Sequence, residues 1–521
     1  MKIIKKIKLF NFKKFNAFEV AFDERINLLI GDNEAGKSSV LLALDLVLSG
    51  SKSKVETLSL ESLFNAEVVN SFLAGNKKLE NLPVLYIEVF LNEQNNPDLN
   101  GKNNSDDKTC DGLRLVCEPV DEFGKEIRDI LSQDHANFPF EYYSIKFSTF
   151  SGEPYTGYRK FVRQLLIDSS QINNEYATRE YIKTIYRANV SDSEKNKHQN
   201  EYRRHKSAFK DNTLDGLNNK LDDYKFSVRT GSKSNLESDL TITEDDIPIE
   251  NKGKGRQCFI KTEFALQRNN AEKDIDVLLL EEPENHLSHV NMKKLIQRIA
   301  NSKEKQLFIA THSNLISARL DLRKAIMLNS NSSTPALLKD LPERTATFFM
   351  KAPDNNILEF ILSRKVILVE GDAEFILIDA MYKNLNAETL ESSDIHVISV
   401  GGTSFKRYLD LAKILSIKTA VIRDNDGNAQ VNCVESFEDY ISDDIKVFYE
   451  TDDEKKTFEV CLYDRNKKIC DDLFAPGRKK LTVLDYMLRN KADVAFELLD
   501  KKGHELISPA YIRSAVEWIK G

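Results

Sequence analysis

The sequence predicts an α/β protein that contains two parallel-sheet domains. Three observations lead to this fold class. A glycine-rich G-x-x-x-x-G-K-S motif lies between a predicted strand and a predicted helix at residues 31–38. A second series of apolar strands alternates with helices from residue 365 onward. The chain has 521 residues, too many for one ordinary core, so two or three domains are expected.

The first domain is expected to begin with a strand over residues 2–10, where apolar and polar residues alternate roughly. The apolar run Ile26–Ile30 predicts a buried strand, and Ser38–Leu48 predicts the helix that follows the glycine-rich turn. Further strands are predicted at Val84–Leu91, Leu113–Val116 and Tyr142–Phe147.

The composition changes between residues 152 and 249. Helices are predicted at Arg159–Asp168 and Tyr176–Ala188, and the stretch Ser191–Thr230 is polar with charges of both signs. We interpret 152–249 as a helical insertion that serves dimerisation or partner binding. A solvated helical arm or a partly ordered linker is the alternative.

Regular periodicity returns after Asn251. Helices are predicted at Cys258–Leu266 and Val290–Ala300, and strands at Ile275–Leu280, Gln306–Ala310 and Lys324–Leu328. The second α/β series has strands Lys365–Val369, His396–Val400 and Thr419–Ile422, helices Ala373–Leu385 and Phe405–Leu415, and three short helices over Val483–Trp518. The expected domains are 1–151 with 250–357, the insertion 152–249, and 358–521.

Charge and cysteine content limit the classes of function. With 74 basic and 82 acidic residues, the net charge of −8 excludes nucleic-acid binding through overall positive charge. A local basic path remains open, and its candidates are Lys406, Arg407, Arg478, Lys479 and Lys480. The six cysteines form no C-x-x-C pair, and no apolar run approaches the ~18 residues of a membrane span, so a reduced, cytoplasmic chain without a membrane partner is expected.

The motif Gly31-Asp-Asn-Glu-Ala-Gly36-Lys37-Ser38 predicts a nucleotide site. Glycines let backbone N–H groups surround a phosphate, Lys37 supplies a cation, and the Ser38 hydroxyl suits Mg²⁺. The predicted nucleotide-binding residues are Asn33, Gly36, Lys37, Ser38, Ser39 and Glu281, and the nucleotide is ATP or another NTP.

Two downstream segments complete this site in the prediction. The apolar strand Val277–Leu280 ends in Glu281, a water-mediated Mg²⁺ ligand, and Glu282, a general base for the attacking water. A later strand leads to His312, which is placed to sense the γ-phosphate. An ordinary strand with a helix cap, and a structural histidine, are the alternatives.

The second domain predicts a metal site made of carboxylates. One apolar strand ends in Glu370, Glu374 follows one helical turn later, and a third strand ends in Asp424-Asn-Asp426. Ligands bind at the carboxyl ends of parallel strands, and hard oxygen ligands suit Mg²⁺ or Mn²⁺. Each fragment alone is also compatible with a simple turn.

The order of the nucleotide motifs resembles the ABC-type ATPases of chromosome maintenance and recombination. The resemblance implies a signature segment, matched by Asn251-Lys-Gly253-Lys-Gly255-Arg-Gln257, which departs from the usual Ser-Gly-Gly core. In that family the signature of one protomer completes the site of another, which implies a homodimer or higher homo-oligomer. Lys13 and Lys14 match a basic pair near the phosphates, and a solvated strand end is the alternative for them.

The order Glu, Gly-Gly, Asp-x-Asp on successive strands resembles a Toprim domain, a Rossmann-like parallel sheet. An ABC-type P-loop ATPase with a helical insertion, followed by Toprim, resembles the OLD (overcoming lysogenisation defect) nuclease family. This resemblance implies a further acid and a lysine. Glu459 matches the acid, Asp464 is a weaker candidate, and Lys491 matches the lysine. Glu370, Glu374, Asp424, Asp426 and Glu459 would hold the metals, and Ser38 would hold the Mg²⁺ of the nucleotide.

The resemblance implies a nucleotide-gated, metal-dependent DNA endonuclease or nickase that acts in anti-phage defence. A helicase, as in Gabija-like systems, or a retron reverse transcriptase with its RNA–DNA is the implied partner. The alternatives are an ATP-controlled DNA clamp, or a repair or recombination protein, with a non-cleaving Toprim domain. A third interpretation is an assembly platform whose polar arm holds the partners.

Overall fold

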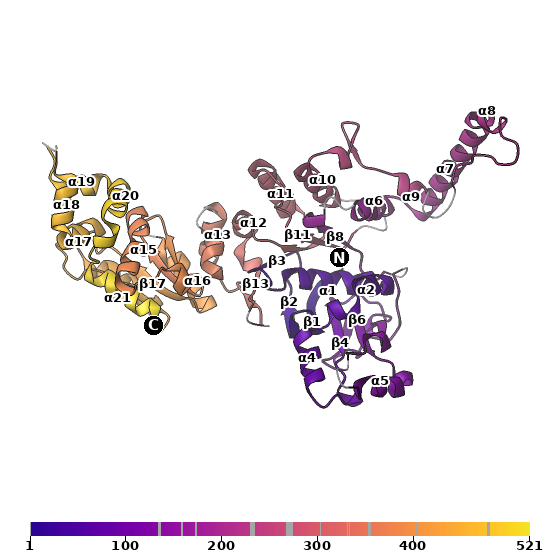
Figure 1. Cartoon of the computed structure of the whole chain (residues 1–521), viewed down its shortest axis with the longest axis horizontal. Helices are drawn as coiled ribbons and strands as arrows, with labels where there is room; N and C mark the ends of the chain where they lie inside the picture. The colour runs from indigo at the N-terminus through magenta and orange to yellow at the C-terminus, as the bar shows by residue number, and fades with distance from the viewer. Residues whose placement is uncertain are drawn as a thin grey trace. The chain divides into compact units, whose positions relative to one another are not determined.

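The computed structural model of the protein divides into two compact units (Figure 1). Unit 1 comprises Met1–His312 and Lys324–Pro335, and unit 2 comprises Ser313–Arg323 and Ala336–Gly521. The structure describes residues 2–133, 137–157, 160–171, 175–229, 235–266, 275–302, 304–330, 332, 334–352, 356–402, 404–476 and 480–521.

Unit 1 contains an antiparallel sheet in which β1 (Ile4–Phe12) lies between β2 (Phe15–Ala21) and β4 (Leu85–Leu91). The sheet continues from β4 to β6 (Cys110–Pro119), which pairs with β5 (Asn100–Gly101) and β7 (Tyr143–Thr149). The strands predicted over 2–10, 84–91, 113–116 and 142–147 are confirmed.

The second sheet of unit 1 is parallel and carries the glycine-rich motif. Its strands lie in the order β13 (Ala325–Leu328), β3 (Ile26–Gly31), β12 (Gln306–Ala310), β11 (Val277–Glu281) and β8 (Gln164–Asp168). Every residue of β3 and β12 is buried, which explains their apolar sequences. β12 therefore separates the strand that ends at the glycine-rich loop from the strand that ends at the acidic pair.

The helix predicted at Arg159–Asp168 is wrong, because Gln164–Asp168 form β8. β8 pairs with β11 in parallel over its whole length, from Gln164 opposite Val277 to Asp168 opposite Glu281. A short apolar run such as Leu165–Ile167 does not distinguish a strand from a helix by periodicity. The pairing with β11, which is distant in sequence, decides the structure here. The predicted limits 152–249 of the insertion stay a prediction, although this stretch supplies an edge strand of the sheet.

The predicted helix at Tyr176–Ala188 is confirmed as α6 (Glu175–Asn189), and the polar stretch forms the long helix α7 (Asp192–Thr213). Ser191 caps α7, since its side chain accepts from the N–H of Glu194 while the Glu194 carboxylate accepts from the N–H of Ser191. α7 has no buried residue and leads to the short helix α8 (Asp215–Asn218) (Figure 1). The remaining elements of unit 1 are α1 (Lys37–Ser49), α2 (Lys52–Leu58), α3 (Leu60–Leu63), α4 (Ala66–Ala74), α5 (Gly124–Leu131), α9 (Leu236–Asp239), β9 (Thr243–Glu244), β10 (Ile247–Pro248), α10 (Lys254–Leu266) and α11 (His289–Asn301).

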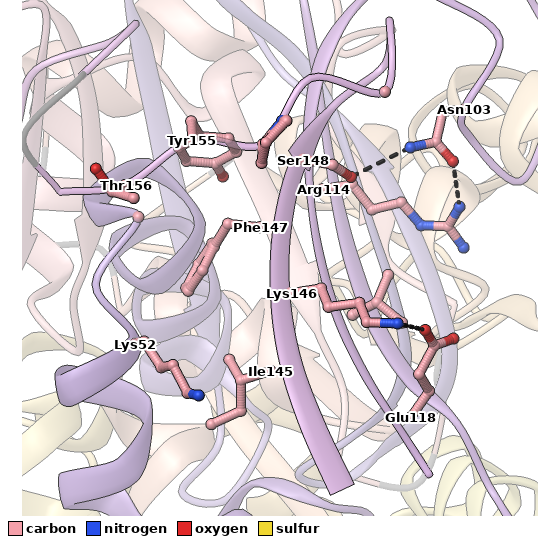
Figure 2. Close-up of a pocket in the computed structure, with 14 residues that line it drawn as sticks. Lys52, Asn103, Arg114, Glu118, Ile145, Lys146, Phe147, Ser148, Tyr155 and Thr156 are labelled. Atoms are coloured by element: carbon pink, nitrogen blue, oxygen red, sulfur yellow. Dashed lines mark hydrogen bonds and ion pairs between the residues drawn. The ribbon is translucent and has the colours of Figure 1, made fainter. Parts of the chain in front are cut away.

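Unit 1 also has a cavity of about 670 Å³ beside β6 and β7 (Figure 2). Ile145, Phe147 and Tyr155 supply apolar wall, and Lys146 pairs with Glu118 at 2.8 Å. None of the residues that line this cavity belongs to the predicted sites.

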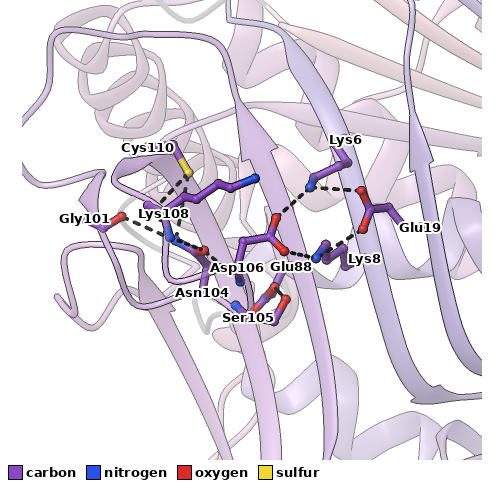
Figure 3. Close-up of polar contacts among 10 residues, drawn as sticks. All are labelled: Lys6, Lys8, Glu19, Glu88, Gly101, Asn104, Ser105, Asp106, Lys108 and Cys110. Atoms are coloured by element: carbon purple, nitrogen blue, oxygen red, sulfur yellow. Dashed lines mark hydrogen bonds and ion pairs between the residues drawn. The ribbon is translucent and has the colours of Figure 1, made fainter.

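A polar network joins the antiparallel sheet to the loop before β6 (Figure 3). Lys6 Nζ donates to Oδ2 of Asp106 at 2.9 Å, and Lys8 donates to the other carboxylate oxygen. Both lysines also lie 3.1 Å from carboxylate oxygens of Glu19. The loop is therefore fixed to the sheet by charge as well as by packing.

Unit 2 has one parallel sheet with the order β16 (Ile395–Ser399), β15 (Lys365–Val369), β17 (Lys418–Ile422) and β18 (Ile445–Phe448). The three strands predicted from the sequence are confirmed, and β18 was not predicted. The helices include α15 (Asp372–Asn386), α16 (Phe405–Leu415), α17 (Phe458–Arg465), α18 (Lys467–Phe474), α19 (Val483–Arg489), α20 (Lys491–Lys502) and α21 (Ala510–Lys520). The three C-terminal helices are confirmed.

Unit 2 also includes elements that precede residue 358. The elements of unit 2 in this region are α12 (Asn314–Arg319), β14 (Ala336–Leu337), α13 (Glu343–Lys351) and α14 (Ile357–Leu362). The Thr345 hydroxyl in α13 donates to buried Asp410 in α16, and the N–H of Leu358 donates to Asn314. These contacts tie the three helices to the second sheet domain. The domain limits themselves stay a prediction.

The predicted α/β class is confirmed in both units. Within the described part of the chain, no helix is both long enough and apolar enough to cross a bilayer.

Candidate nucleotide and metal sites

Two glycines shape the loop between β3 and α1. A Cβ on Gly31 would lie 2.2 Å from the carbonyl oxygen of Leu328, and a Cβ on Gly36 would lie 2.5 Å from the Phe15 ring. Gly36 also has a φ of +98°, a backbone conformation that is unfavourable for residues with a Cβ atom. The local packing therefore requires glycine at both positions, as the phosphate-binding motif predicts.

Lys37 begins α1 and is only 7% exposed. Its Nζ donates to the carbonyl oxygens of Gly31 at 2.7 Å and Asp32 at 2.8 Å. Burial lowers the pKa of Lys37, and the carboxylates of Glu282, Asp32, Glu281 and Glu284 oppose that shift. The loop thus holds a partly desolvated ammonium group at the start of a helix, where an anion is favoured.

Ser38 and Glu281 come together at the end of β11. Ser38 is exposed, and its side chain lowers the pKa of the Glu281 carboxyl. Burial raises the pKa of Glu281, and the charges of Asp168 and Glu282 raise it further. Asp168 is the register partner of Glu281 on β8, and it was not predicted because that segment was expected to be a helix.

Glu282 and His312 also meet at this edge. Nε2 of His312 lies 3.8 Å from Oε1 of Glu282, and Asn285 Nδ2 donates to Oε2 of Glu282. Glu282 has a φ of +45°, so a turn follows β11 at this residue. Both predicted residues are therefore placed on adjacent strand ends.

Glu284 was not predicted, yet it holds the His312 segment. Its Oε1 accepts from the Thr311 hydroxyl at 2.7 Å and from the N–H of His312 at 2.8 Å. Burial raises the pKa of the Glu284 carboxyl, and both hydrogen bonds oppose that shift. The sequence feature that could have indicated Glu284 is its place as the second glutamate of Glu-Pro-Glu, directly after an apolar strand.

The remaining predicted nucleotide residues lie on the same loop and helix. Asn33 is exposed and Ser39 is half-buried. Lys14 lies beside Gly36, because a Cβ added to Gly36 would be 3.0 Å from Cδ of Lys14. Nζ of Lys14 donates to the carbonyl oxygen of Asn329 at 2.8 Å. Lys13, by contrast, is held by a backbone bond from its N–H to Leu63.

The predicted signature segment forms the start of α10. A Cβ on Gly255 would lie 2.0 Å from the carbonyl oxygen of His286, whereas Gly253 has open space around it. Lys252 and Arg256 both pair with Glu244 of the same chain. Gly255 is therefore fixed against the turn that follows β11.

The predicted carboxylates of unit 2 gather at the carboxyl end of its sheet. Glu370 follows β15, Glu374 lies in the first turn of α15, Asp424 and Asp426 follow β17, and Glu459 lies in the first turn of α17. The pKa of Asp424 is raised to about 8 by burial and by the charges of Glu374, Glu370 and Glu459. Burial likewise raises the pKa of Glu374 to about 7.

Lys491 begins α20 and pairs with Glu459. Its Nζ lies 3.0 Å from Oε2 of Glu459, which is also the acceptor of the Thr457 hydroxyl at 2.9 Å. The Glu459 side chain is only 3% exposed, and that of Lys491 is 50% exposed. Asp464 instead pairs with Lys455 at 2.8 Å on the surface.

Arg423 is a further residue of this cluster that was not predicted from the sequence. Its guanidinium donates to Glu370 and to Asp426. The available signal was its position at the end of a strand, directly before Asp424.

The donor set suits a hard divalent cation, because it consists of carboxylate oxygens held close enough to raise each other's pKa. Among the described residues, however, no three carboxylate, histidine or cysteine side chains converge as a metal-holding group. Lys491 and Arg423 supply positive charge to Glu459 and Glu370 instead.

The predicted basic path is only partly described. Arg407 donates to the Thr345 hydroxyl at 3.1 Å, Lys406 lies over the Phe437 ring, and Lys480 is exposed. Arg478 and Lys479 lie outside the described residues.

Two family models match this chain, one over each of the regions that carry these sites. The model of the AAA ATPase domain matches residues 1–316. The chain belongs to the AAA ATPase domain family. The model of the TOPRIM domain of overcoming lysogenization defect (OLD)-like proteins matches residues 361–426, so an OLD-like Toprim domain follows the AAA ATPase domain. The predicted resemblance to OLD proteins is thereby confirmed.

The chain is also similar to the Old nuclease of Escherichia phage P2, with 23% identity over 175 residues. The match covers 32% of this chain and 30% of the relative, so it spans less than a third of that protein.

Solved structures with similarity include the C-terminal region of the OLD protein of Xanthomonas campestris pv. campestris (25% identity, 31% of this chain and 94% of that chain, TM-score 0.24). The SMC head domain from Thermotoga maritima shares 13% identity over 64% of this chain and 98% of that chain, with a TM-score of 0.30. The assignment rests on the family models, and the two domains imply the use of a nucleotide and of a divalent metal ion in general terms.

Proposed function

We propose that the protein is a nucleotide-gated, divalent-metal-dependent DNA endonuclease or nickase of the OLD type. The observation that carries this proposal is the gathering of Glu370, Glu374, Asp424 and Glu459, with Lys491, from four separate segments at one edge of the unit 2 sheet. Buried carboxylates of like charge cost stability unless a cation joins them. Their presence together favours a binding function over a scaffold.

In this proposal Mg²⁺ or Mn²⁺ would be held by Glu370, Glu374, Asp424, Asp426 and Glu459. The bound ion would supply activation of water and stabilisation of the leaving oxygen of a phosphodiester. The N–H of Phe458 donates to Oδ1 of Asp424 at 2.8 Å and fixes the orientation of that carboxylate. Lys491, half-exposed beside Glu459, stabilises the negative charge that develops on the phosphate.

The nucleotide site is proposed to gate this activity. The phosphates of ATP or another NTP, with the associated Mg²⁺, are bound by Asn33, Gly36, Lys37, Ser38 and Ser39. Glu281 binds this Mg²⁺ through water. Glu282 acts as general base and His312, 3.8 Å from it, senses the γ-phosphate. Phosphate release by Glu282→Gln compared with the unmodified chain decides whether ATP is hydrolysed or only sensed.

The substrate is proposed to be DNA, and the working form a homodimer or higher homo-oligomer. The helical insertion and the start of α10 are the proposed contacts between copies. The cellular role is proposed to be anti-phage defence in the cytoplasm, with a helicase or a retron reverse transcriptase and its RNA–DNA as partner.

Nicking of supercoiled plasmid with Mg²⁺ or Mn²⁺ tests the proposal. We expect relaxation or linearisation by the unmodified chain, loss of it with chelator, and loss in a Glu370→Ala, Asp424→Ala double variant. Asp464→Ala, on the same unit and paired with Lys455, is the matched control. Undiminished nicking by the double variant would remove the site assignment.

A second candidate is an ATP-controlled DNA clamp with a non-cleaving Toprim domain. The observation that favours it is the pairing of Glu459 and Glu370 with Lys491 and Arg423. Nucleotide-dependent DNA binding without any broken phosphodiester would support this candidate over the nuclease.

A further inference from the structure

Arg423 connects two of the proposed metal ligands across two strands. It follows β17 directly and precedes Asp424. Its Nη1 donates to Oε2 of Glu370, beyond β15, and its Nη2 donates to Oδ2 of Asp426 at 2.8 Å. One side chain thus joins the ends of the two central strands of the unit 2 sheet, which pair in parallel.

Arg423 is held firmly in this place. Its side chain is 8% exposed, and its backbone N–H donates to the carbonyl of Phe448 in β18 at 3.1 Å. The guanidinium carbon lies 6.0 Å from the centre of the Phe405 ring. Asp426 has a φ of +50°, so the turn directs its carboxylate back towards the strand end.

The hydrogen bonds of Arg423 leave part of each carboxylate available. In the described part of the chain, the guanidinium bonds to one oxygen of Glu370 and one oxygen of Asp426. The second oxygen of each group can still bind a cation. Carboxylates that bind metals are commonly oriented by such outer hydrogen bonds, and loss of the outer partner typically costs about 10–100-fold in metal affinity.

We propose that Arg423 is a positioning residue that orients Glu370 and Asp426 for a divalent cation. This inference rests on the proposed metal-dependent function of the same site. Lysine cannot replace arginine in the role, because a point charge does not span two carboxylates as the planar guanidinium does.

Binding of Mn²⁺ to the full chain, measured by isothermal titration calorimetry without DNA, tests the proposal. We expect Arg423→Lys and Arg423→Gln to bind Mn²⁺ about 10–100-fold more weakly than the unmodified chain. Arg364→Gln is the matched control, since Arg364 is exposed and lies at the opposite end of β15. Metal-free melting temperatures check that each variant folds.

A second readout separates positioning from a structural role. The Mn²⁺ concentration that half-saturates plasmid nicking should rise in Arg423→Lys, and the rate should recover at saturating Mn²⁺. Equal Mn²⁺ affinity in all variants would overturn the proposal. Tighter binding by Arg423→Gln would also overturn it, and would show that the guanidinium competes with the metal.

The two proposals fail in different ways. Absence of nicking by the unmodified chain, with weaker Mn²⁺ binding by the Arg423 variants, would remove the nuclease function and keep the role of Arg423. Normal Mn²⁺ binding by these variants, with metal-dependent nicking by the unmodified chain, would remove the role of Arg423 and keep the nuclease function.

Discussion

Nζ of Lys491 lies 3.0 Å from Oε2 of Glu459, so the first residue of α20 contacts the buried acid at the start of α17. The charges of Glu459, Asp424 and Glu374 raise the pKa of Lys491 against the effect of burial. Lys491 is therefore a charged group at the rim of the carboxylate cluster rather than an isolated surface lysine.

Replacing Lys491 by Met should slow plasmid nicking by about 10²–10³-fold, because one preorganised positive group near the developing phosphate charge is lost. The measurement is the single-turnover nicking rate at saturating Mn²⁺. Lys501→Met is the control, since Lys501 pairs with half-buried Glu497 on the same helix. Equal rates for both variants would contradict the role of Lys491.

Glu284 should position His312. Replacing Glu284 by Ala removes the acceptor for Thr311 and for the N–H of His312, and we expect phosphate release to fall by about 10-fold or more. Glu284→Gln keeps one acceptor oxygen and should retain most of the rate. A fluorescent ATP analogue checks that nucleotide binding persists. Normal phosphate release by the Ala variant would contradict this positioning.

The two glycines of the signature segment form a matched pair. Gly255→Ala places a Cβ 2.0 Å from the His286 carbonyl, whereas Gly253→Ala meets nothing within 4 Å. We expect Gly255→Ala to lower stability by about 1–3 kcal/mol and Gly253→Ala to change it by at most about 0.5 kcal/mol. Thermal melting of both variants measures the difference. A smaller loss at Gly255 than at Gly253 would contradict the packing described.

Three strands of unit 2, β15, β16 and β17, were predictable because each is a short and largely apolar run. Part of the ligand order was predictable too, because acids follow two of these strands, at Glu370 and Asp424. β8 was not predictable, because its pairing with β11 depends on a segment more than a hundred residues away. Glu284 and Arg423 were missed for a related reason. Their partners, Thr311 with His312 and Glu370 with Asp426, include residues from other strand ends, which spacing alone does not reveal.

The Asp106 network predicts a pH dependence of stability. Hydrogen bonds from Lys8 and then Lys6 lower the pKa of Asp106 from 3.8 to about 2 (Figure 3). A lowered pKa stabilises the folded chain above the unfolded value, and this contribution disappears as the pH falls from about 4 to about 2.

Asp106→Asn should therefore melt below the unmodified chain at pH 6, by an amount equivalent to at most about 1 kcal/mol. The gap between the two melting temperatures should close as the pH is lowered towards 2. A gap that does not depend on pH would show that Asp106 acts through packing alone.

The carboxylates of unit 2 are proposed to form a metal-dependent phosphodiesterase site. The most direct test compares Mn²⁺-dependent nicking by Asp424→Asn and Asp464→Asn. Asparagine at 424 keeps an acceptor for the N–H of Phe458 and removes the charge, whereas Asp464 lies on the surface beside Lys455. We predict that Asp424→Asn loses at least about 10³-fold in rate, an effect on the scale of several kcal/mol, and that Asp464→Asn retains full activity. Retention of nicking by Asp424→Asn would show that these carboxylates do not form the nuclease site.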